Sequence, residues 1–179
     1  MFKLAICNAW ILSIIFCAIG IIFMVTKKDL SKRMADMTGY TAREKFFTIA
    51  ASVMPYPFMV LTVWKPFTSI IPLLYIGISF YLIGMALFAL SLRIIIQTPQ
   101  NALFSTGPYR FTRNPMYVAA TIVFMAICLV AANIVLAIYL AIAVLFQHFM
   151  ILAEERMCKE MYGRAYEDYL KRVPRYIVL

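Results

Sequence analysis

The sequence predicts an all-α integral membrane protein, a bundle of about five transmembrane helices, and three observations support this fold class. Apolar residues make up 64% of the 179 residues and charged residues only 14%, against roughly 45–50% and 25% in an average soluble domain. The mean hydropathy is +0.86, and the charges are separated by long uncharged runs. A soluble globule of this size cannot bury so much apolar surface. A soluble enzyme, a nucleic-acid-binding module and a disordered chain are therefore excluded.

Three uncharged runs in the first half of the chain are each long enough to form a membrane span. They cover Leu4–Thr26, Phe46–Trp64 and Pro66–Leu92, and a bilayer core about 30 Å thick needs roughly 20 helical residues. The first run is too long for the apolar region of a signal peptide and lacks a small-residue cleavage site. Pro55 and Pro57 remove backbone donors from the second run, so we expect its helix to kink or break there.

A fourth uncharged run, Asn114–Ala153, is too long for a single span. Its 40 residues would form a helix about 60 Å long, twice the thickness of the bilayer core. We therefore expect a helical hairpin that turns near Ala131–Ala132–Asn133, which brings the number of spans to five. In the charged stretch that follows, Glu154–Arg172, apolar residues recur every four positions: Met157, Met161, Ala165 and Tyr169. This pattern predicts a cytoplasmic amphipathic helix at the membrane surface.

The basic residues predict which side of the bundle is cytoplasmic. Of the 17 Lys and Arg, all but Lys3 and Lys65 fall in segments 27–45 and 93–113 and in the C-terminal tail. A five-span topology places these three segments on one side, which the positive-inside rule makes cytoplasmic together with the C-terminus. The net charge of +9 then predicts contact with anionic membrane lipids and gives no reason to expect nucleic acid.

Neither a disulfide framework nor a metal site is predicted. Four cysteines occur without paired spacing: Cys7, Cys17, Cys128 and Cys158. One histidine with scattered carboxylates does not make a zinc site either. We expect a single membrane domain, with three spans in residues 1–96 and a loop, the hairpin and the C-terminal helix in residues 97–179.

Two polar stretches flank the final hairpin, and the hairpin must bring them together at the cytoplasmic side. One is the loop 97–113, rich in Pro, Gly, Thr, Ser and Asn, and the other begins at Glu154–Glu155. In one interpretation Gly107–Pro108 is a turn, Asn114 and Pro115 start a helix, and the charges face lipid phosphates and water. In the other, acidic and basic groups converge beside the bundle and hold a polar ligand that carries an ammonium and a carboxylate.

The motifs of these stretches occur in a specific order: Gly107–Pro108–Tyr109–Arg110, Arg113–Asn114–Pro115–Met116–Tyr117, Glu154–Glu155, Tyr162–Gly163, Tyr166, Tyr169 and Val173–Pro174–Arg175. In order and spacing they resemble the superfamily of isoprenylcysteine carboxyl methyltransferases and phospholipid methyltransferases, over roughly the C-terminal half of the chain. The resemblance implies a membrane methyltransferase that uses S-adenosylmethionine without a Rossmann domain, and a lipophilic or small-molecule methyl acceptor. The sequence contains no glycine-rich strand-to-helix fingerprint.

The resemblance also implies which residues contact the cofactor: Asn101, Ala102, Leu103, Phe104, Tyr109, Asn114, Pro115, Met116, Tyr117 and Glu154. Asn101 and Asn114 replace histidines of the best-known members, and asparagine still donates and accepts hydrogen bonds. Prenylcysteine enzymes place an arginine four residues before the first glutamate, where this chain has Met150. Methionine cannot pair with a carboxylate, which argues against a prenylcysteine substrate.

Candidate catalytic residues follow from what methyl transfer from a sulfonium requires, which is alignment, exclusion of water and an unprotonated nucleophile. His148 and Glu155 are seven residues apart and share a helix face. His148 would suit a base, or it is a helix-end residue hydrogen-bonded to a neighbour or a headgroup. Arg113 is expected to brace the loop against a carboxylate. The cofactor would enter from the cytosol and the acceptor laterally between spans.

Two other functions stay open at the level of the sequence. A sterol or isoprenoid reductase of related fold would use NADPH and would need basic contacts for the 2′-phosphate. A non-enzymatic membrane interaction protein would bind no cofactor and would use the tail helix as its docking surface.

Overall fold

The computed structural model describes residues 8–99 and 102–176, and the predicted all-α fold class is confirmed. Within these ranges the extended pairing is limited to an isolated bridge between Asn8 and Pro66. Lys3, Cys7 and Asn101 lie outside the described residues. The helical elements are α1 (Trp10–Thr26), α2 (Lys28–Met34), α3 (Ala42–Val53), α4 (Pro55–Thr62), α5 (Ile71–Gln97), the 3-10 helix η1 (Gly107–Arg110), α6 (Pro115–Ala131), α7 (Ile134–Tyr162) and α8 (Arg164–Arg172).

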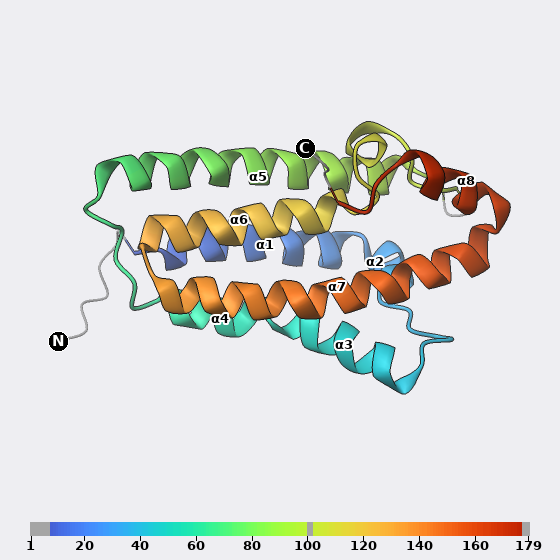
Figure 1. Ribbon diagram of the computed structural model, residues 1–179, viewed down its shortest axis with the longest axis horizontal. Coiled ribbons are helices and arrows are strands. Elements are labelled where there is room, and N and C mark those ends of the chain that lie inside the picture. The colour runs from blue at the N-terminus through green and yellow to red at the C-terminus, as the bar shows by residue number, and fades with distance from the viewer. Residues whose placement is uncertain (1–7, 100–101, 177–179) are drawn as a thin grey trace.

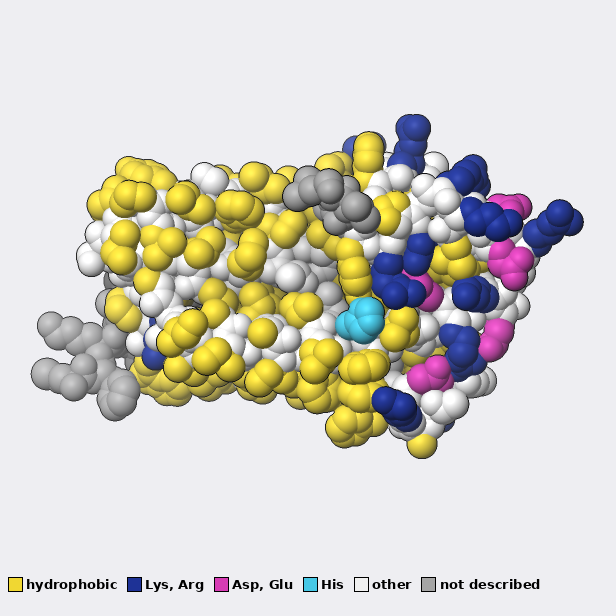
Figure 2. Space-filling view, in the orientation of Figure 1, with side chains coloured by type: hydrophobic (Ala, Val, Ile, Leu, Met, Phe, Trp, Pro, Cys, Tyr) yellow, Lys and Arg dark blue, Asp and Glu magenta, His cyan; other side chains and the backbone are white. Residues whose placement is uncertain are grey.

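The apolar helices lie side by side along the long axis of the molecule, and α2, η1 and α8 gather at one end (Figure 1). Three helical segments are long and apolar enough to cross a membrane, namely Ala42–Thr62, α5 and α7, while α1 and α6 are shorter, with 17 residues each. Hydrophobic side chains cover most of the length of the bundle, and charged side chains gather at the end that carries α8 (Figure 2). The chain is therefore an integral membrane helical bundle with one charged end.

The second apolar segment breaks at the position that its prolines predict. Helix α3 ends at Val53, and α4 begins with Pro55 at its first position. The hydroxyl of Tyr139, on α7, donates a hydrogen bond of 2.9 Å to the carbonyl oxygen of Met54. The same oxygen accepts a 3.4 Å hydrogen bond from the backbone nitrogen of Phe58, so the Tyr139 hydroxyl adds a second donor and ties α7 to the break.

The predicted hairpin turn between the last two apolar helices is confirmed. Helix α6 ends at Ala131, and Ala132 adopts a left-handed conformation with φ of 44°. Asn133 then begins α7, because its side-chain Oδ1 accepts a 3.2 Å hydrogen bond from the backbone nitrogen of Leu136. An asparagine at this position is a preferred helix N-cap.

Two predicted boundaries are wrong, because a charged residue marks where a helix leaves the bilayer and not where it ends. The third span was expected to end at Leu92, whereas α5 continues to Gln97. A separate surface helix was expected from Glu154, whereas α7 continues without interruption to Tyr162. The chain turns only at Gly163, whose φ of 51° is easily adopted by glycine.

The amphipathic C-terminal helix is therefore only α8, and its buried face differs from the predicted stripe. Tyr166 and Tyr169 are buried on α8, whereas Ala165 is exposed and Met161, on α7, is 63% exposed. The expected four-residue repeat ran through Gly163, where the helical phase is interrupted.

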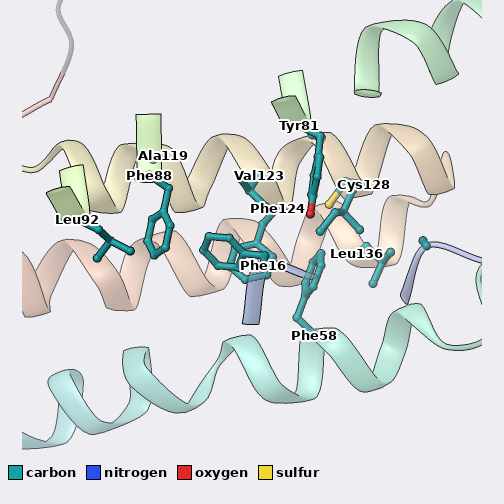
Figure 3. Packing of buried hydrophobic residues seen from close by; sticks show 13 residues of the cluster. Phe16, Phe58, Tyr81, Phe88, Leu92, Ala119, Val123, Phe124, Cys128 and Leu136 are labelled. Carbon is teal, nitrogen blue, oxygen red and sulfur yellow. The ribbon is translucent and has the colours of Figure 1, made fainter. Parts of the chain in front are cut away.

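Aromatic side chains from α1, α4, α5 and α6 form the centre of the bundle (Figure 3). Phe16 of α1 and Phe58 of α4 both contact Phe124 of α6, with ring centroids 5.3 Å and 4.9 Å apart in edge-on geometry. Tyr81 of α5 reaches the same core, and its hydroxyl donates a 2.9 Å hydrogen bond to the carbonyl oxygen of Leu12. Such aromatic pairs favour one arrangement of the helices.

Helices α5 and α6 pack closely because two glycines of α5 face α6. A Cβ atom on Gly77 would lie 2.6 Å from a methyl carbon of Val130 and 3.1 Å from the carbonyl oxygen of Ala126. A Cβ atom on Gly84 would lie 2.8 Å from a methyl carbon of Val123. Small residues at such contacts allow two membrane helices to approach closely.

We expect Gly77→Ala and Gly84→Ala each to destabilise the protein by about 1–3 kcal/mol, because the added methyl group overpacks this contact. Thermal unfolding in detergent measures the change. Gly20→Ala is the matched control, since a Cβ atom there meets nothing within 4 Å, and its better helix propensity leaves stability equal or slightly higher. Wild-type unfolding temperatures for both α5 variants would contradict the close contact.

Candidate active site

A cavity of about 260 Å³ lies at the charged end of the bundle. Its walls come from the connection between α2 and α3, the loop after α5 with η1, the start of α6, the end of α7, and α8. Segments far apart in the sequence thus meet around one space. The two polar stretches that flank the hairpin are among them, as the hairpin geometry predicts.

Most residues that the family resemblance singles out line this cavity. They are Leu103, Phe104, Tyr109, Asn114, Met116, Tyr117 and Glu154, together with Arg113 and Glu155. Pro115 is buried at the first position of α6, and the carbonyl oxygen of Ala102 accepts a 3.5 Å hydrogen bond from the hydroxyl of Tyr162. Neither Pro115 nor Ala102 is a lining residue.

Glu155 is a buried carboxylate that two arginines neutralise. The Nε atom of Arg113 donates to Oε1 of Glu155 at 3.0 Å, and Nε and Nη2 of Arg175 donate to Oε2 at 3.0 Å and 2.9 Å. The side-chain amide of Asn114 adds a 3.2 Å hydrogen bond to Oε1. Glu155 is only 5% exposed, so these donors replace the water that its charge would otherwise need. We call this arrangement the Glu155 clamp.

The clamp also fastens the C-terminal segment to the loop before α6. The backbone nitrogen of Arg113 donates to the carbonyl oxygen of Pro174 at 2.9 Å. The Thr112 hydroxyl and the Asn114 amide donate to the carbonyl oxygen of Arg175 at 2.8 Å and 3.3 Å. Asn114 occupies the N-cap position of α6, as predicted, but its side chain makes no capping hydrogen bond there. Its amide instead joins Glu155 to the tail.

Glu154, the neighbour of Glu155, is bound quite differently. The hydroxyl of Tyr117 donates a 2.5 Å hydrogen bond to Oε1 of Glu154. No hydrogen bond to Oε2 of Glu154 comes from the residues that the structure describes. The carboxylate lies on the cavity wall, so one of its oxygens can accept hydrogen bonds from a ligand.

The aromatic part of the wall is held in place by hydrogen bonds and ring contacts. The hydroxyl of Tyr169 donates to the backbone oxygen of Tyr109 at 2.6 Å, and the rings of Phe104 and Tyr109 lie 5.6 Å apart. Burial raises the pKa of Tyr169 to about 12, and burial, with Tyr169 and Glu154 nearby, raises the pKa of Tyr109. Both phenols therefore stay protonated at neutral pH and can donate hydrogen bonds.

His148 does not reach the cavity wall formed by the described residues. Its Nδ1 atom lies 2.8 Å from the hydroxyl of Tyr176, and its ring packs edge-on against Phe149. His148 and Glu155 are both on α7, as predicted, but the carboxylate of Glu155 is enclosed by the clamp.

One wall of the cavity was missed at the level of the sequence. It consists of five residues between the start of α2 and the start of α3: Leu30, Met34, Asp36, Thr38 and Tyr40. The distribution of basic residues could have indicated this wall, because it places segment 27–45 on the same side of the membrane as the loop and the tail. Tyr166 and Tyr169 of the motifs also line the cavity, and the end of α7 adds lining residues that the motifs did not single out: Met157, Cys158 and Met161.

The fold and the cavity define the class of this protein, an integral membrane helical bundle with a cavity at its charged end. The described residues contain no group of three or more His, Cys, Asp or Glu that could hold a metal ion. A comparison with protein families matches residues 59–165 to the family described as phospholipid methyltransferase. Since the match covers more than half of the chain, this protein belongs to the phospholipid methyltransferase family.

Family membership confirms the predicted superfamily and identifies the protein as a membrane methyltransferase. It favours methyl transfer over the reductase and the non-enzymatic function that the sequence left open. Comparisons with curated proteins and with solved structures give no match.

The Glu155 clamp yields a prediction about stability. We expect Glu155→Gln to lower the free energy of unfolding by about 3–5 kcal/mol, because it leaves two guanidinium groups without their buried counter-charge. Thermal unfolding in detergent measures this loss. The control is Asp168→Asn, which breaks the exposed Lys171–Asp168 pair of 3.0 Å and costs about 0–1 kcal/mol. Equal unfolding temperatures for the two variants would show that the clamp does not hold the fold together.

Proposed function

We propose that this protein transfers a methyl group from S-adenosylmethionine to a lipophilic acceptor at the cytoplasmic face of the membrane. The observation that carries the proposal is the Glu154–Tyr117 pair, which presents an incompletely bonded carboxylate to an aromatic cavity next to the membrane-spanning helices. The family description names phospholipids, which supports a lipid as the acceptor. A smaller apolar molecule is the other acceptor class that the cavity admits.

The chemistry of the cavity fits this cofactor. S-adenosylmethionine carries a sulfonium and an ammonium against one carboxylate, so its net charge is positive, and the described wall includes the acidic side chains Glu154 and Asp36. Aromatic rings such as Tyr109 and Phe104 attract a nearby cation and can cover a nucleobase. The volume of about 260 Å³ lies just below the range for ligand pockets, which begins at roughly 300 Å³.

Within this proposal the protein acts by binding, orientation and exclusion of water. The bound cofactor supplies an activated methyl group whose transfer removes the positive charge of the sulfonium. Glu154 accepts hydrogen bonds from the ligand and is itself oriented by the hydroxyl of Tyr117. The aromatic and methionine side chains of the wall keep water from the reacting groups. Arg113 and Glu155 position the loop and the tail around the cavity, and no oxyanion hole is required.

The membrane-spanning helices give the acceptor its route. Helix α7 combines an apolar segment long enough to cross a membrane with the carboxylate of Glu154 near its C-terminal end. A lipid that lies beside α7 can therefore reach the cavity laterally with its headgroup. The excess of Lys and Arg at this end of the bundle supports a cytoplasmic orientation.

A nicotinamide cofactor fits the lining less well. NADPH carries a pyrophosphate and a 2′-phosphate, which proteins bind mainly with arginine and lysine. Arg113 is the one basic side chain among the described lining residues, and it is paired with Glu155. Asp36 and Glu154 would repel the phosphates.

The test of the cofactor site is Glu154→Gln. We expect the dissociation constant for S-adenosylmethionine to rise about 10- to 100-fold, because a hydrogen bond to a charged group is worth about 1.5–3 kcal/mol. Isothermal titration calorimetry on the purified protein in detergent measures it. The matched control is Glu167→Gln, at an exposed position of α8, which keeps wild-type affinity. An unchanged affinity in Glu154→Gln would contradict the proposed role of Glu154 in cofactor binding.

The acceptor is identified by transfer of label. We expect purified protein, supplied with methyl-labelled S-adenosylmethionine and a lipid extract of its host, to label a component of the lipid phase. Mass spectrometry of that component gives the acceptor. Parallel thermal-shift titrations with S-adenosylmethionine and with NADPH compare the two cofactors, and stabilisation by NADPH alone would favour the reductase.

A further inference from the structure

The cavity has a wall that lies outside the region matched to the family. The match begins at residue 59, whereas the wall between α2 and α3 consists of residues in the range 30–40. We call this range the N-terminal wall. The region that matches the family therefore accounts for only part of the cavity surface, and the N-terminal wall supplies another part.

A single arginine of α7 holds the N-terminal wall against the rest of the cavity. Nε and Nη2 of Arg156 donate to the two carboxylate oxygens of Glu44, each at 2.8 Å, and Nη2 also donates to the carbonyl oxygen of Gly39 at 2.9 Å. Glu44 in turn closes the capping box of α3 with Thr41. This bidentate ion pair fixes the end of the N-terminal wall with defined geometry.

The contact continues along α7 toward the cavity. A Cβ atom on Gly39 would lie 3.3 Å from the terminal methyl carbon of Met157, so the backbone of the N-terminal wall packs directly on α7. Next to it, Tyr40 is half-buried and lines the cavity with Glu154 and Cys158. Burial, followed by the nearby Glu154 and Cys158, raises the pKa of Tyr40, which keeps its hydroxyl protonated as a hydrogen-bond donor.

Asp36 adds an acidic group on the same wall. Its Oδ1 atom accepts hydrogen bonds from the backbone nitrogen and the hydroxyl of Thr38, at 2.9 Å and 2.6 Å. Its second oxygen has no hydrogen-bond partner among the residues that the structure describes. Asp36 and Glu154 therefore present carboxylate oxygens to one cavity from two different segments, which suits a ligand of positive net charge.

We propose that the N-terminal wall forms part of the S-adenosylmethionine site, with Tyr40 and Asp36 in contact with the cofactor and Arg156 as the positioning residue that holds the wall closed. This inference rests on the proposed function. Arg156 acts through Glu44 and Gly39 and does not itself line the cavity. Loss of its bidentate pair opens the wall, and loss of the Tyr40 hydroxyl removes a ligand contact while the wall stays closed.

The first experiment measures the closure of the wall without any cofactor. In a protein that keeps Cys158 and carries alanine at Cys7, Cys17 and Cys128, the rate of maleimide labelling of Cys158 reports access to the cavity. We expect Arg156→Gln and Glu44→Gln to raise this rate by about tenfold, since each removes the bidentate ion pair. Glutamine at position 44 keeps a side chain suited to the capping box, so the effect does not come from loss of the cap.

The matched control is Glu160→Gln. Glu160 also accepts a hydrogen bond from Arg156, at 2.6 Å, but it lies on α7 itself and is exposed. Its loss leaves the N-terminal wall attached, so labelling stays at the wild-type rate. Labelling of Arg156→Gln at the wild-type rate would overturn the positioning role.

The second experiment measures cofactor affinity by calorimetry in the same variants. We expect Arg156→Gln and Tyr40→Phe each to weaken S-adenosylmethionine binding by about tenfold, and only Arg156→Gln to speed labelling of Cys158. Bound cofactor protects Cys158 in the wild-type protein. If Tyr40 instead had a purely structural role, Tyr40→Phe would speed labelling of Cys158 as well as weaken cofactor binding.

The outcomes separate this inference from the proposed function. If Glu154→Gln loses affinity while Arg156→Gln and Tyr40→Phe bind like the wild type, the N-terminal wall plays no part in the cofactor site and the proposed function stands. If the wild-type protein binds no S-adenosylmethionine, the proposed function fails and this inference fails with it.

Discussion

A carboxylate buried at the edge of a bilayer must have its charge neutralised by donors within hydrogen-bond distance, and Glu155 meets this requirement through the loop and the tail. Arg113 comes from the segment before α6, and Arg175 follows α8. Because both arginines converge on one side chain of α7, the last polar segment of the chain is tied to the loop before α6. The cavity walls formed by the loop and by α8 depend on this connection, since neither segment belongs to the apolar bundle.

Adjacent carboxylates on one helix have different tasks because successive residues point about 100° apart. Glu155 turns toward the arginines and has its oxygens occupied. Glu154 turns toward Tyr117 and the cavity. The saturated carboxylate stabilises the fold, whereas the incompletely bonded one is available to a ligand. Two consecutive residues of α7 therefore serve different purposes, one holding the loop and the tail together and the other presenting a carboxylate to the cavity.

Much of the fold is predictable from the sequence, because uncharged runs longer than 20 residues have few structural solutions in a membrane. The hairpin turn at Ala132 and the break at Pro55 follow from length and from proline chemistry. The extension of α7 to Tyr162 does not, because a helix can continue after its side chains become charged. The site motifs identified Glu154 and Tyr117, but not Tyr40 or Arg156, whose proximity depends on packing between segments more than 100 residues apart.

The uninterrupted length of α7 has a mechanical consequence. Its 29 residues extend about 44 Å at 1.5 Å per residue, whereas the hydrocarbon layer is about 30 Å thick. The apolar part of α7 thus contacts acyl chains, and Glu154 lies nearer the C-terminal end of the same unbroken helix. When such a helix tilts to match a thicker or thinner bilayer, the carboxylate moves along the membrane normal. The acyl-chain length of the surrounding lipids thereby sets the depth of Glu154 and of the cavity relative to the lipid headgroups.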